Sequence, residues 1–413
     1  MTTEILPNGF DLTDPDMNLV AVPHDQFTAL RRTSPMHWVE QTESARAGMA
    51  TEAGTGYWAV TKHADIAAVS RNNRVFSSRE NGALIRNPES VTRESVELTR
   101  VVIINQDAPE HTQTRSIVNR GFTPRAIGAL EAILEERARR IVRDAVAAGG
   151  GNFVDQIASQ LPLEVIADML GIPEQDRTKI FDWSNQMTAS TDPDFPGDPA
   201  VATTEILMYS MGLSAERKEN PRDDIVTKLV NANKDGRGLT DDEFGFFVIA
   251  LAVAGNETTR NAITHGMNAF FDNPEQWDLW KKDRPTTMVD EVIRWATPVT
   301  SFQRTALEDV ELGGVQIKAG QRVGLFYASA NHDEDVFDNP FTFDITRDPN
   351  PHLSFGGHGA HYCVGANLAR TEIRLIFEAL ANLAPRIQRT GNAARLRHGW
   401  LNGIKDLPVA YGR

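Results

Sequence analysis

The chain has 413 residues, of which 41% are hydrophobic and 24% are charged, and its formal net charge is −14. These values are ordinary for a globular protein and exclude a disordered, fibrous or disulfide-stapled chain. The negative charge argues against nucleic acid or an anionic membrane as a general partner, because both attract basic surfaces. The N-terminal segment has neither a basic cluster nor an apolar run, so we expect no signal peptide, no membrane anchor and cytoplasmic residence.

Cysteine occurs once, at Cys363, which excludes an internal disulfide and an iron–sulfur cluster held by the chain's own cysteines. The sequence also lacks a glycine-rich dinucleotide fingerprint and a Walker loop. Any electrons for redox chemistry must therefore come from another protein. No repeat, low-complexity segment or linker divides the sequence, and we expect a single domain over residues 1–413.

The first strong helix signal lies between two predicted surface loops, residues 42–56 and 188–200. Thr123 can cap a helix that begins at Pro124, because proline needs no hydrogen-bond donor at a first-turn position. An apolar stripe of helical period follows, and Gly149 marks the end. The pattern predicts a long amphipathic helix.

A second helix is predicted to begin at the capping box of Thr240 and Glu243 and to run to Pro274. At 1.5 Å per residue it would be about 50 Å long. Its apolar composition indicates that it crosses the centre of the protein.

Strand signals are sparse. The segment 310–312 alternates apolar and charged residues, Gly313 and Gly314 can form a turn, and further apolar residues follow at 315–325, which together predict a small sheet. After Cys363 the apolar residues return to helical spacing. We therefore expect a mainly α fold with small β-sheets, with the cysteine at a loop-to-helix junction.

The segment 355–365 surrounds Cys363 with glycines just before this last helix. Glycines let the backbone approach a flat, bulky ligand, and the N-terminus of a helix favours an anion such as a thiolate. Two other readings remain open for an isolated cysteine. It can be a small buried hydrophobe, or a nucleophile with His358 or His361 as its base.

This segment resembles the haem-binding loop of the cytochrome P-450 superfamily at Gly359, His361, Cys363 and Gly365. The superfamily's phenylalanine is expected at position 356, where this chain has Gly356, and Phe355 stands one residue earlier. The resemblance implies a cytochrome P-450 fold, with haem b between the long helix and the cysteine loop and its helix. Cys363 would be the iron ligand, and Phe355, Gly359 and Gly365 would contact the haem.

Within the long helix, Glu257 and Thr258 place a carboxylate beside a hydroxyl in an apolar run. The Thr258 hydroxyl can bond the carbonyl of Ala254 and loosen the helix there, with Gly255 assisting. The pair could simply satisfy itself inside a core helix. It also resembles the superfamily's acid–alcohol motif, which implies that Thr258 is the oxygen-activating hydroxyl and Glu257 the acid that supplies protons.

Glu291 and Arg294 are three residues apart in a helical run and can pair, which usually marks a solvated helix face. By resemblance to the superfamily, this pair and Arg347 form a structural lock. The same resemblance supplies four donors for the haem propionates, and charge-assisted hydrogen bonds are the physical reason. They are His111, Arg115, Arg304 and His361.

Nearly the whole chain is similar to the actinobacterial steroid C26/C27 monooxygenases. The similarity rests on residues 8–15, 244–248, 294–300 and 399–405, among others. The resemblance implies hydroxylation of the terminal methyl of a sterol side chain of the cholesterol or cholest-4-en-3-one type, with further oxidation to the carboxylic acid. An apolar pocket suits such a substrate. The residues predicted to line this pocket are Phe246, Val253 and Ala254. The alternative is that they are ordinary core residues.

Dioxygen is the expected co-substrate, and two electrons per cycle would come from NAD(P)H through a reductase and a ferredoxin. Four arginines could form a docking patch for that acidic partner on the cysteine side, although they could equally be solvated residues of helix surfaces. They are Arg115, Arg120, Arg370 and Arg374. We expect a monomer. The alternative functions are oxidation of another hydrophobic substrate, such as a fatty acid, terpenoid or polyketide, and a haem-binding module without turnover.

Overall fold

The computed structural model describes residues 10–50, 52, 54–189, 191–195, 197–222, 224–231 and 238–412. The α-helices are α1 (Pro15–Val20), α2 (His24–Thr33), α3 (His63–Arg71), α4 (Arg93–Leu98), α5 (Glu110–Val118), α6 (Pro124–Ala148), α7 (Gln160–Met169), α8 (Glu174–Thr188), α9 (Pro199–Glu219), α10 (Ile225–Val230), α11 (Asp241–Ala252), α12 (Thr258–Asp272), α13 (Pro274–Asp283), α14 (Met288–Ala296), α15 (Tyr327–Ala330) and α16 (Ala366–Leu383). Short 3₁₀ or π turns are η2 (Thr99–Val101), η3 (Ile103–Asn105), η4 (Asn119–Gly121), η5 (Val154–Ala158) and η6 (Val253–Glu257).

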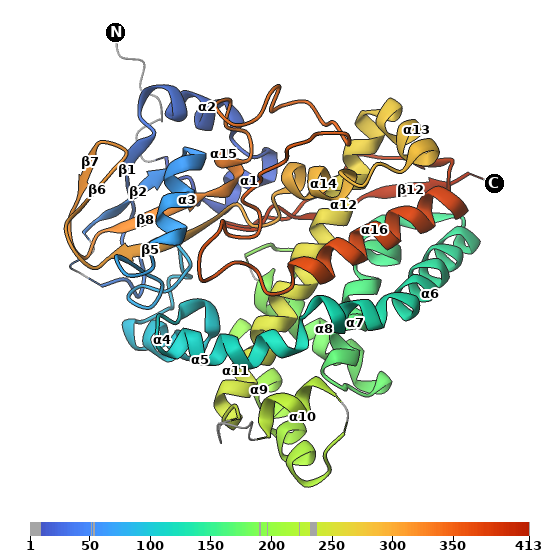
Figure 1. The fold of residues 1–413 in the computed structure, drawn as a ribbon, viewed down its shortest axis with the longest axis horizontal. Helices are drawn as coiled ribbons and strands as arrows, with labels where there is room; N and C mark the ends of the chain where they lie inside the picture. Colours follow the sequence, from blue (N-terminus) through green and yellow to red (C-terminus); the bar gives the residue numbers. More distant parts are fainter. Residues whose placement is uncertain are drawn as a thin grey trace.

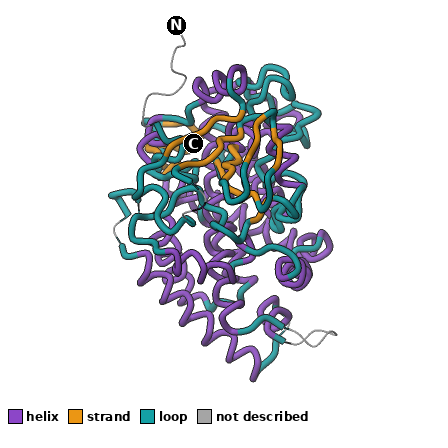
Figure 2. Tube along the Cα trace, turned by 90° about the vertical axis from the view of Figure 1, so that its left-hand side faces the viewer, coloured by secondary structure: helices purple, strands orange, loops and turns teal. Residues whose placement is uncertain are grey.

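The strands are short, as follows: β1 (Met36–Glu40), β2 (Gly56–Val60), β3 (Phe76–Ser77), β4 (Gly150–Asn152), β5 (Ser301–Ala306), β6 (Val310–Leu312), β7 (Val315–Ile317), β8 (Arg322–Phe326), β9 (Ile387–Arg389), β10 (Ala394–Arg395), β11 (Ile404–Asp406) and β12 (Pro408–Tyr411). Helices fill the lower part of the molecule and strands gather in its upper part (Figures 1 and 2). The predicted mainly α architecture with small sheets is confirmed.

Helix α6 has the predicted ends. The Thr123 side chain accepts a hydrogen bond from the Ala126 amide, Pro124 opens the helix, and Gly149 closes it with a φ of 85°. Because glycine adopts positive φ without a Cβ penalty, it can end a helix in this way. The buried stripe of α6 packs along α16, the helix that follows Cys363.

The long helix is present and is divided by a π turn. Its capping box of Thr240 and Glu243 forms as predicted. Helix α11 continues through η6 into α12, which ends at Asp272. The helix is loosened where predicted, and it is a π turn at 253–257 that loosens it. Such single π turns are the usual way in which a helix accommodates an altered hydrogen-bond pattern. This continuous run crosses the middle of the molecule (Figure 1).

The strands predicted at 310–325 belong to two sheets, not to one. Strands β6 and β7 form a separate hairpin across the predicted glycine turn. Strand β8 joins a five-stranded sheet of order β1-β2-β8-β5-β3, in which it pairs parallel with β2 and antiparallel with β5. The sequence prediction missed β1 and β2, because long-range pairing leaves little local signal in such short strands.

The predicted surface loops are only partly correct. The segment 42–56 is irregular where it is described and ends as β2 begins at Gly56. The segment 188–200 connects α8 to α9 and is shorter than predicted, because proline at the first-turn position starts α9 at Pro199. Residues 51, 53, 190 and 196 lie outside the described residues.

A large buried apolar cluster holds the helices together, and two smaller clusters cover the faces of the main sheet. The large cluster includes residues of α6, α11, α12 and α16, so it fixes the long helix relative to the helix that follows the cysteine. None of the described helices combines the length and apolar character that a bilayer crossing requires.

Candidate functional site

The cysteine loop is a compact turn that returns on itself. The Cys363 amide donates to the Phe355 carbonyl at 3.0 Å. Gly356 and Gly357 have φ values of 89° and 75°, which L side chains rarely adopt. A Cβ at Gly359 would lie 1.6 Å from the carbonyl oxygen of a residue in α3. These glycines are therefore required by backbone conformation and close approach.

Cys363 has solvent-accessible surface, although protein groups surround its thiol. Burial raises the pKa of Cys363, and the backbone amide of Gly365 and the charges of Arg115 and Arg370 oppose that rise. The surroundings thus provide one hydrogen-bond donor and two positive charges for a thiolate, which is the electrostatic setting of a metal-binding sulfur.

Phe355 packs beside this loop. The guanidinium of Arg370 lies 4.6 Å above the Phe355 ring, and the ring of Tyr362 is 6.0 Å away. Arg370 also donates to Asp290 at 2.8 Å. The phenylalanine therefore anchors the loop to α16 through a cation–π contact.

The four predicted propionate donors lie in one cluster. The rings of His111 and His361 are 4.1 Å apart. Burial and the neighbouring positive charges, that of Arg304 first, lower the pKa of His361 to about 2. Burial likewise lowers the pKa of Arg304 and of Arg115.

Three of these groups, the buried His111 and Arg304 and the half-buried Arg115, have no carboxylate partner among the residues that the structure describes. Nε2 of His111 is buried without a partner among the described residues. Nη1 of Arg304 donates to the carbonyl of Gln303, and Nη2 of Arg115 donates to the carbonyl of Tyr362. Buried cationic donors normally pair with anions. The cluster therefore fits an anionic ligand with several acceptor oxygens, such as the carboxylates of a haem.

One face of the long helix lines accessible space. Phe246, Val253 and Thr258 are half-buried and Ala254 is exposed, while most of α11 is buried. The Thr258 hydroxyl donates to the Ala254 carbonyl at 2.5 Å, as predicted. The structure therefore brings the predicted substrate-contacting residues onto the same stretch of helix as Thr258.

Glu257 has a different environment from its neighbour Thr258. It is fully buried and forms an ion pair with Arg260, one turn along the helix. Burial raises the pKa of Glu257, and the charge of Arg260 lowers it. Arg260 was not predicted, although its i,i+3 spacing from Glu257 is the same as the spacing that indicated the pair of Glu291 and Arg294.

The predicted lock is assembled in the core. Arg294 makes two hydrogen bonds of 2.8 Å to Glu291, and Arg347 donates to the same carboxylate at 3.1 Å. Arg294 also donates to the carbonyls of Asn331 and Pro340. Because Glu291 and Arg294 are both fully buried, the solvated-face reading of this pair does not apply.

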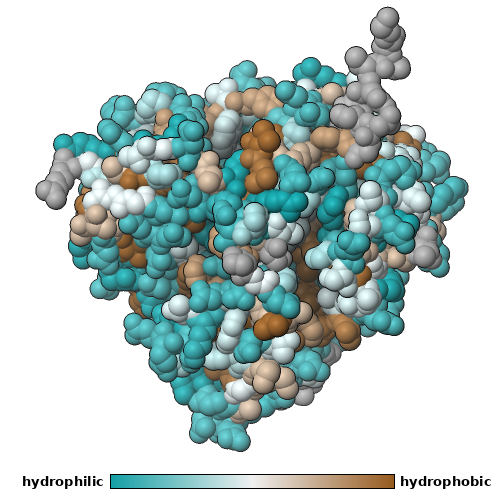
Figure 3. Space-filling model, turned by 180° about the vertical axis from the view of Figure 1, so that it is seen from behind, coloured by the Kyte–Doolittle hydropathy of each residue, from teal (hydrophilic) through white to brown (hydrophobic). Residues whose placement is uncertain are grey.

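The surface bears an apolar recess. On the face seen in Figure 3, polar surface surrounds a hollow whose floor is apolar. A recess of this kind suits a hydrophobic ligand, whose burial is favoured in proportion to the apolar area removed from water.

Comparison with known proteins agrees with these features. The family model described as Cytochrome P450 matches residues 286–382. A steroid C26-monooxygenase of Rhodococcus jostii is 56% identical over 98% of this chain and 85% of its own length. A methyl-branched lipid omega-hydroxylase of Mycobacterium tuberculosis is 42% identical over 93% of this chain and 90% of its own.

Solved structures agree as well. A Mycobacterium marinum cytochrome P450 in complex with pseudoionone is 38% identical, covers 100% of both chains and has a TM-score of 0.89. The chain belongs to the cytochrome P450 family. It is a haem- and dioxygen-dependent monooxygenase with the cytochrome P450 fold, which acts on a hydrophobic substrate with redox partners.

Proposed function

We propose that this enzyme hydroxylates the terminal methyl of a sterol side chain of the cholesterol or cholest-4-en-3-one type, and oxidises the alcohol further to the carboxylic acid. The observation that carries the proposal is the 56% identity, over nearly the full chain, to a steroid C26-monooxygenase. The apolar stretch of Phe246, Val253 and Ala254 leading to Thr258 supports it, because a long aliphatic side chain needs an apolar path to the reacting centre.

We assign Cys363 as the haem-iron ligand and His111, Arg115, Arg304 and His361 as propionate donors. Haem b, when bound, supplies the iron that binds and activates dioxygen. The Gly365 amide hydrogen-bonds the sulfur and stabilises its thiolate form. Glycine at 365 places no side chain beside the sulfur, from which a Cβ there would be 4.0 Å away, and glycine at 359 lets the loop lie against α3.

We assign the proton relay to Glu257 and Thr258. Oxygen activation consumes protons, so a site that excludes water needs a donor inside it. The Thr258 hydroxyl is held by the Ala254 carbonyl at the accessible face of the helix. Glu257, buried behind it, is the ionisable group that takes up and releases the proton.

For electron supply we propose a separate ferredoxin that docks on the cysteine side and receives electrons from NAD(P)H through a reductase. Arg120 is exposed, whereas Arg370 and Arg374 already pair with carboxylates. Arg120→Glu is therefore the cleanest test. It should slow reduction by ferredoxin several-fold at low salt, and Arg222→Glu, beyond α9, should not. Equal rates in the two variants would contradict the docking site.

The substrate test is turnover with purified ferredoxin and reductase, followed by mass spectrometry of the products. We expect cholest-4-en-3-one to give the terminal alcohol and then the acid. The second candidate is a methyl-branched lipid, because a relative with that printed activity is 42% identical. Efficient oxidation of branched fatty lipids without oxidation of the sterol would favour it. Ligand binding without any product would instead indicate a module that does not turn over.

A further inference from the structure

Buried polar atoms without protein partners surround the π turn η6. Asn256 is 1% exposed, and neither its amide oxygen nor its amide nitrogen has a partner among the described residues. The same is true of Oε1 of Glu257 and Nε of Arg260. Because buried polar groups in folded proteins bind either protein groups or ordered water, these atoms indicate bound water beside the π turn.

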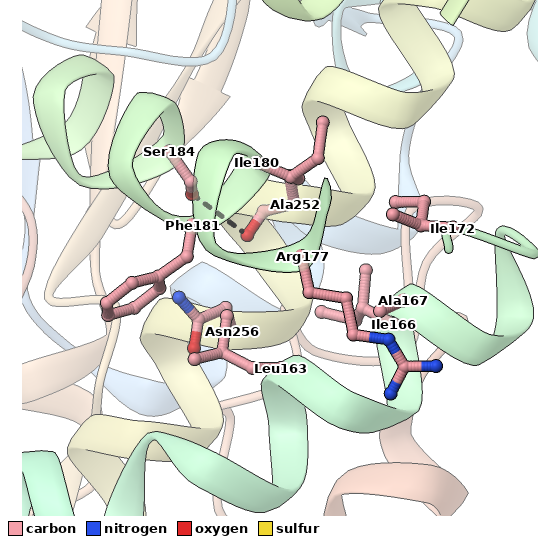
Figure 4. Close-up of a pocket in the computed structure, with 10 residues that line it drawn as sticks. All are labelled: Leu163, Ile166, Ala167, Ile172, Arg177, Ile180, Phe181, Ser184, Ala252 and Asn256. Atoms are coloured by element: carbon pink, nitrogen blue, oxygen red, sulfur yellow. Dashed lines mark hydrogen bonds between the residues drawn. The ribbon is translucent and has the colours of Figure 1, made fainter. Parts of the chain in front are cut away.

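Asn256 also lines a small pocket between η6, α7 and α8. Figure 4 shows its side chain between Leu163 of α7 and Phe181 of α8. The pocket has a volume of about 20 Å³, and although most of its lining is apolar, the polar side chains of Asn256, Ser184 and Arg177 face it, so it has room and partners for one water molecule. On its α8 side, the Ser184 hydroxyl donates to the Ala252 carbonyl at 3.3 Å. The pocket therefore reaches the backbone of the long helix from the side of α7 and α8.

Arg260 connects this side of the helix with Glu257. Its Nη2 pairs with Oε2 of Glu257, and its Nη1 donates to Oδ1 of Asn185 in α8 at 3.3 Å. The Arg260 side chain is 6% exposed and that of Glu257 is 0% exposed. In so buried a pair each charge depends on the other, because neither is solvated by bulk water.

Two further charged or titratable groups lie on the helices packed against this part of the long helix. Arg177 of α8 lines the pocket; its Nη2 donates to Asp168 of α7 at 2.6 Å, and its buried Nε has no partner among the described residues. Glu372 of α16 bonds to Thr259. Among the described residues, Arg260 is the only charge that acts on the pKa of Glu257, lowering it against the rise caused by burial.

We propose that Arg260 is a positioning residue that holds the Glu257 carboxylate beside water bound at Asn256, so that protons enter the relay from the α7 and α8 side of the long helix. The inference rests on the proposed role of Glu257. In each transfer the bound water gives a proton to Oε1 of Glu257 and takes another from the next solvent molecule. Glu257 then passes its proton to the Thr258 oxygen as that hydroxyl releases its own proton on the accessible face of the helix, and the carboxylate is restored. Arg260 keeps its own proton throughout.

The first test is an infrared pH titration of the holoenzyme that follows the carboxylic acid band lost in Glu257→Gln. Arg260→Gln should raise the apparent pKa of Glu257 by at least about one pH unit, because an opposite charge at contact distance lowers a carboxyl pKa by about 1–3 units. Arg260→Lys keeps the charge and should restore most of the shift. Arg177→Gln, in the same pocket but without contact to Glu257, is the matched control.

An unchanged titration in Arg260→Gln, or an equal shift in Arg177→Gln, would overturn the role of Arg260. Should Arg260→Gln fail to retain haem, Asn185→Asp addresses the same point. Its carboxylate would compete for the Arg260 guanidinium and raise the pKa of Glu257 in the same direction.

The second test addresses the side of proton entry. At a pH where Glu257 is protonated, transfer into D₂O shifts its band, and the rate of that shift reports exchange with solvent. Asn256→Leu removes both polar atoms from the pocket and should slow the exchange about tenfold or more, since it deprives bound water of its partners. An unchanged exchange rate would overturn the entry route.

Neither measurement requires turnover, so the role of Arg260 and the proposed relay through Glu257 and Thr258 can be disproved separately. If Glu257→Gln gave full product yield, the proposed relay would be wrong. The infrared titration would still decide whether Arg260 governs the protonation of Glu257.

Discussion

Neighbouring residues of the long helix differ in what they contact. Thr258 and Val253 are half-buried on the accessible stretch of the helix, whereas Glu257 is fully buried beside Arg260. Because successive helical residues point about 100° apart, one segment can present a hydroxyl to a substrate space and keep a carboxyl away from it. The chemistry assigned to this helix depends on that separation.

Val253→Phe should weaken sterol binding about tenfold or more, because the larger ring fills space that the side chain of the substrate needs. Val253→Ala should bind sterol nearly as well as the wild type. Both variants should retain full haem content. Sterol titration followed by the haem absorption spectrum measures the affinity, and an unchanged affinity in Val253→Phe would remove this residue from the pocket.

Thr258→Val keeps the shape of the side chain and removes the hydroxyl. We expect haem content and sterol affinity to stay the same and product formed per NADH oxidised to fall at least about tenfold, within the range typical of general acid–base groups. The difference should appear as hydrogen peroxide. Product yield equal to that of the wild type would show that another group delivers the proton.

The packing of α12 against α16 buries the carboxyl group of Glu372 in the core. Glu372 of α16 is almost fully buried, and burial raises its pKa to about 8, against a smaller lowering by its hydrogen bond with Thr259 of α12. The side chain is therefore protonated in the folded protein at neutral pH and ionised in the unfolded chain. This helix pair is thus sensitive to pH.

Between the ordinary pKa of 4.5 and the folded value of about 8, the folded state binds the extra proton. Stability must therefore fall as pH rises through this window, by up to about 1.4 kcal/mol per pH unit from this group. Glu372→Gln should remove that slope, so its thermal midpoint should exceed that of the wild type increasingly from pH 5 to pH 8. Parallel profiles for the two proteins would contradict the buried acid.

Local pattern predicted the helices well. The cap at Thr123 with the glycine at Gly149, and the capping box at Thr240, are short-range signals and the structure has all of them. The main sheet was not predicted, because β2 and β8 pair across more than 250 residues of sequence. The close approach of Gly359 to α3 is likewise a long-range contact, so spacing could indicate the glycine but not its neighbour.

The resemblance to cytochromes P450 supplied site residues that spacing alone could not. Nothing local links His111 to His361, and only the fold brings their rings to 4.1 Å. Arg260 shows the converse. It stands three residues after Glu257, a spacing that would have predicted the ion pair.

For the whole molecule, the Glu291 lock joins distant parts of the chain. Through Arg294 and Arg347 it connects α14 to the segment 331–347. The Asn331 side chain in turn accepts a hydrogen bond from the amide of Leu353, just before the cysteine loop. We propose that the described residues form one domain, because these contacts and the large apolar cluster span most of the chain.

Glu291→Ala should lower the free energy of unfolding by about 3–5 kcal/mol, since it leaves two buried arginines without their carboxylate. Haem retention should fall with it, because the lock supports the cysteine loop. Glu135→Ala removes one partner of an exposed ion pair on α6 and should cost less than about 1 kcal/mol. Thermal unfolding and haem content of the two variants measure the difference, and equal losses would contradict the structural role.

The assigned chemistry requires that the Cys363 sulfur bind haem iron as a thiolate. The most direct measurement is the carbon monoxide difference spectrum of the reduced protein, compared with that of Cys363→Ser. We predict the red-shifted band of a thiolate-ligated haem in the wild type and its complete loss in the variant. A wild-type spectrum without that band, or a Cys363→Ser spectrum that keeps it, would contradict the account.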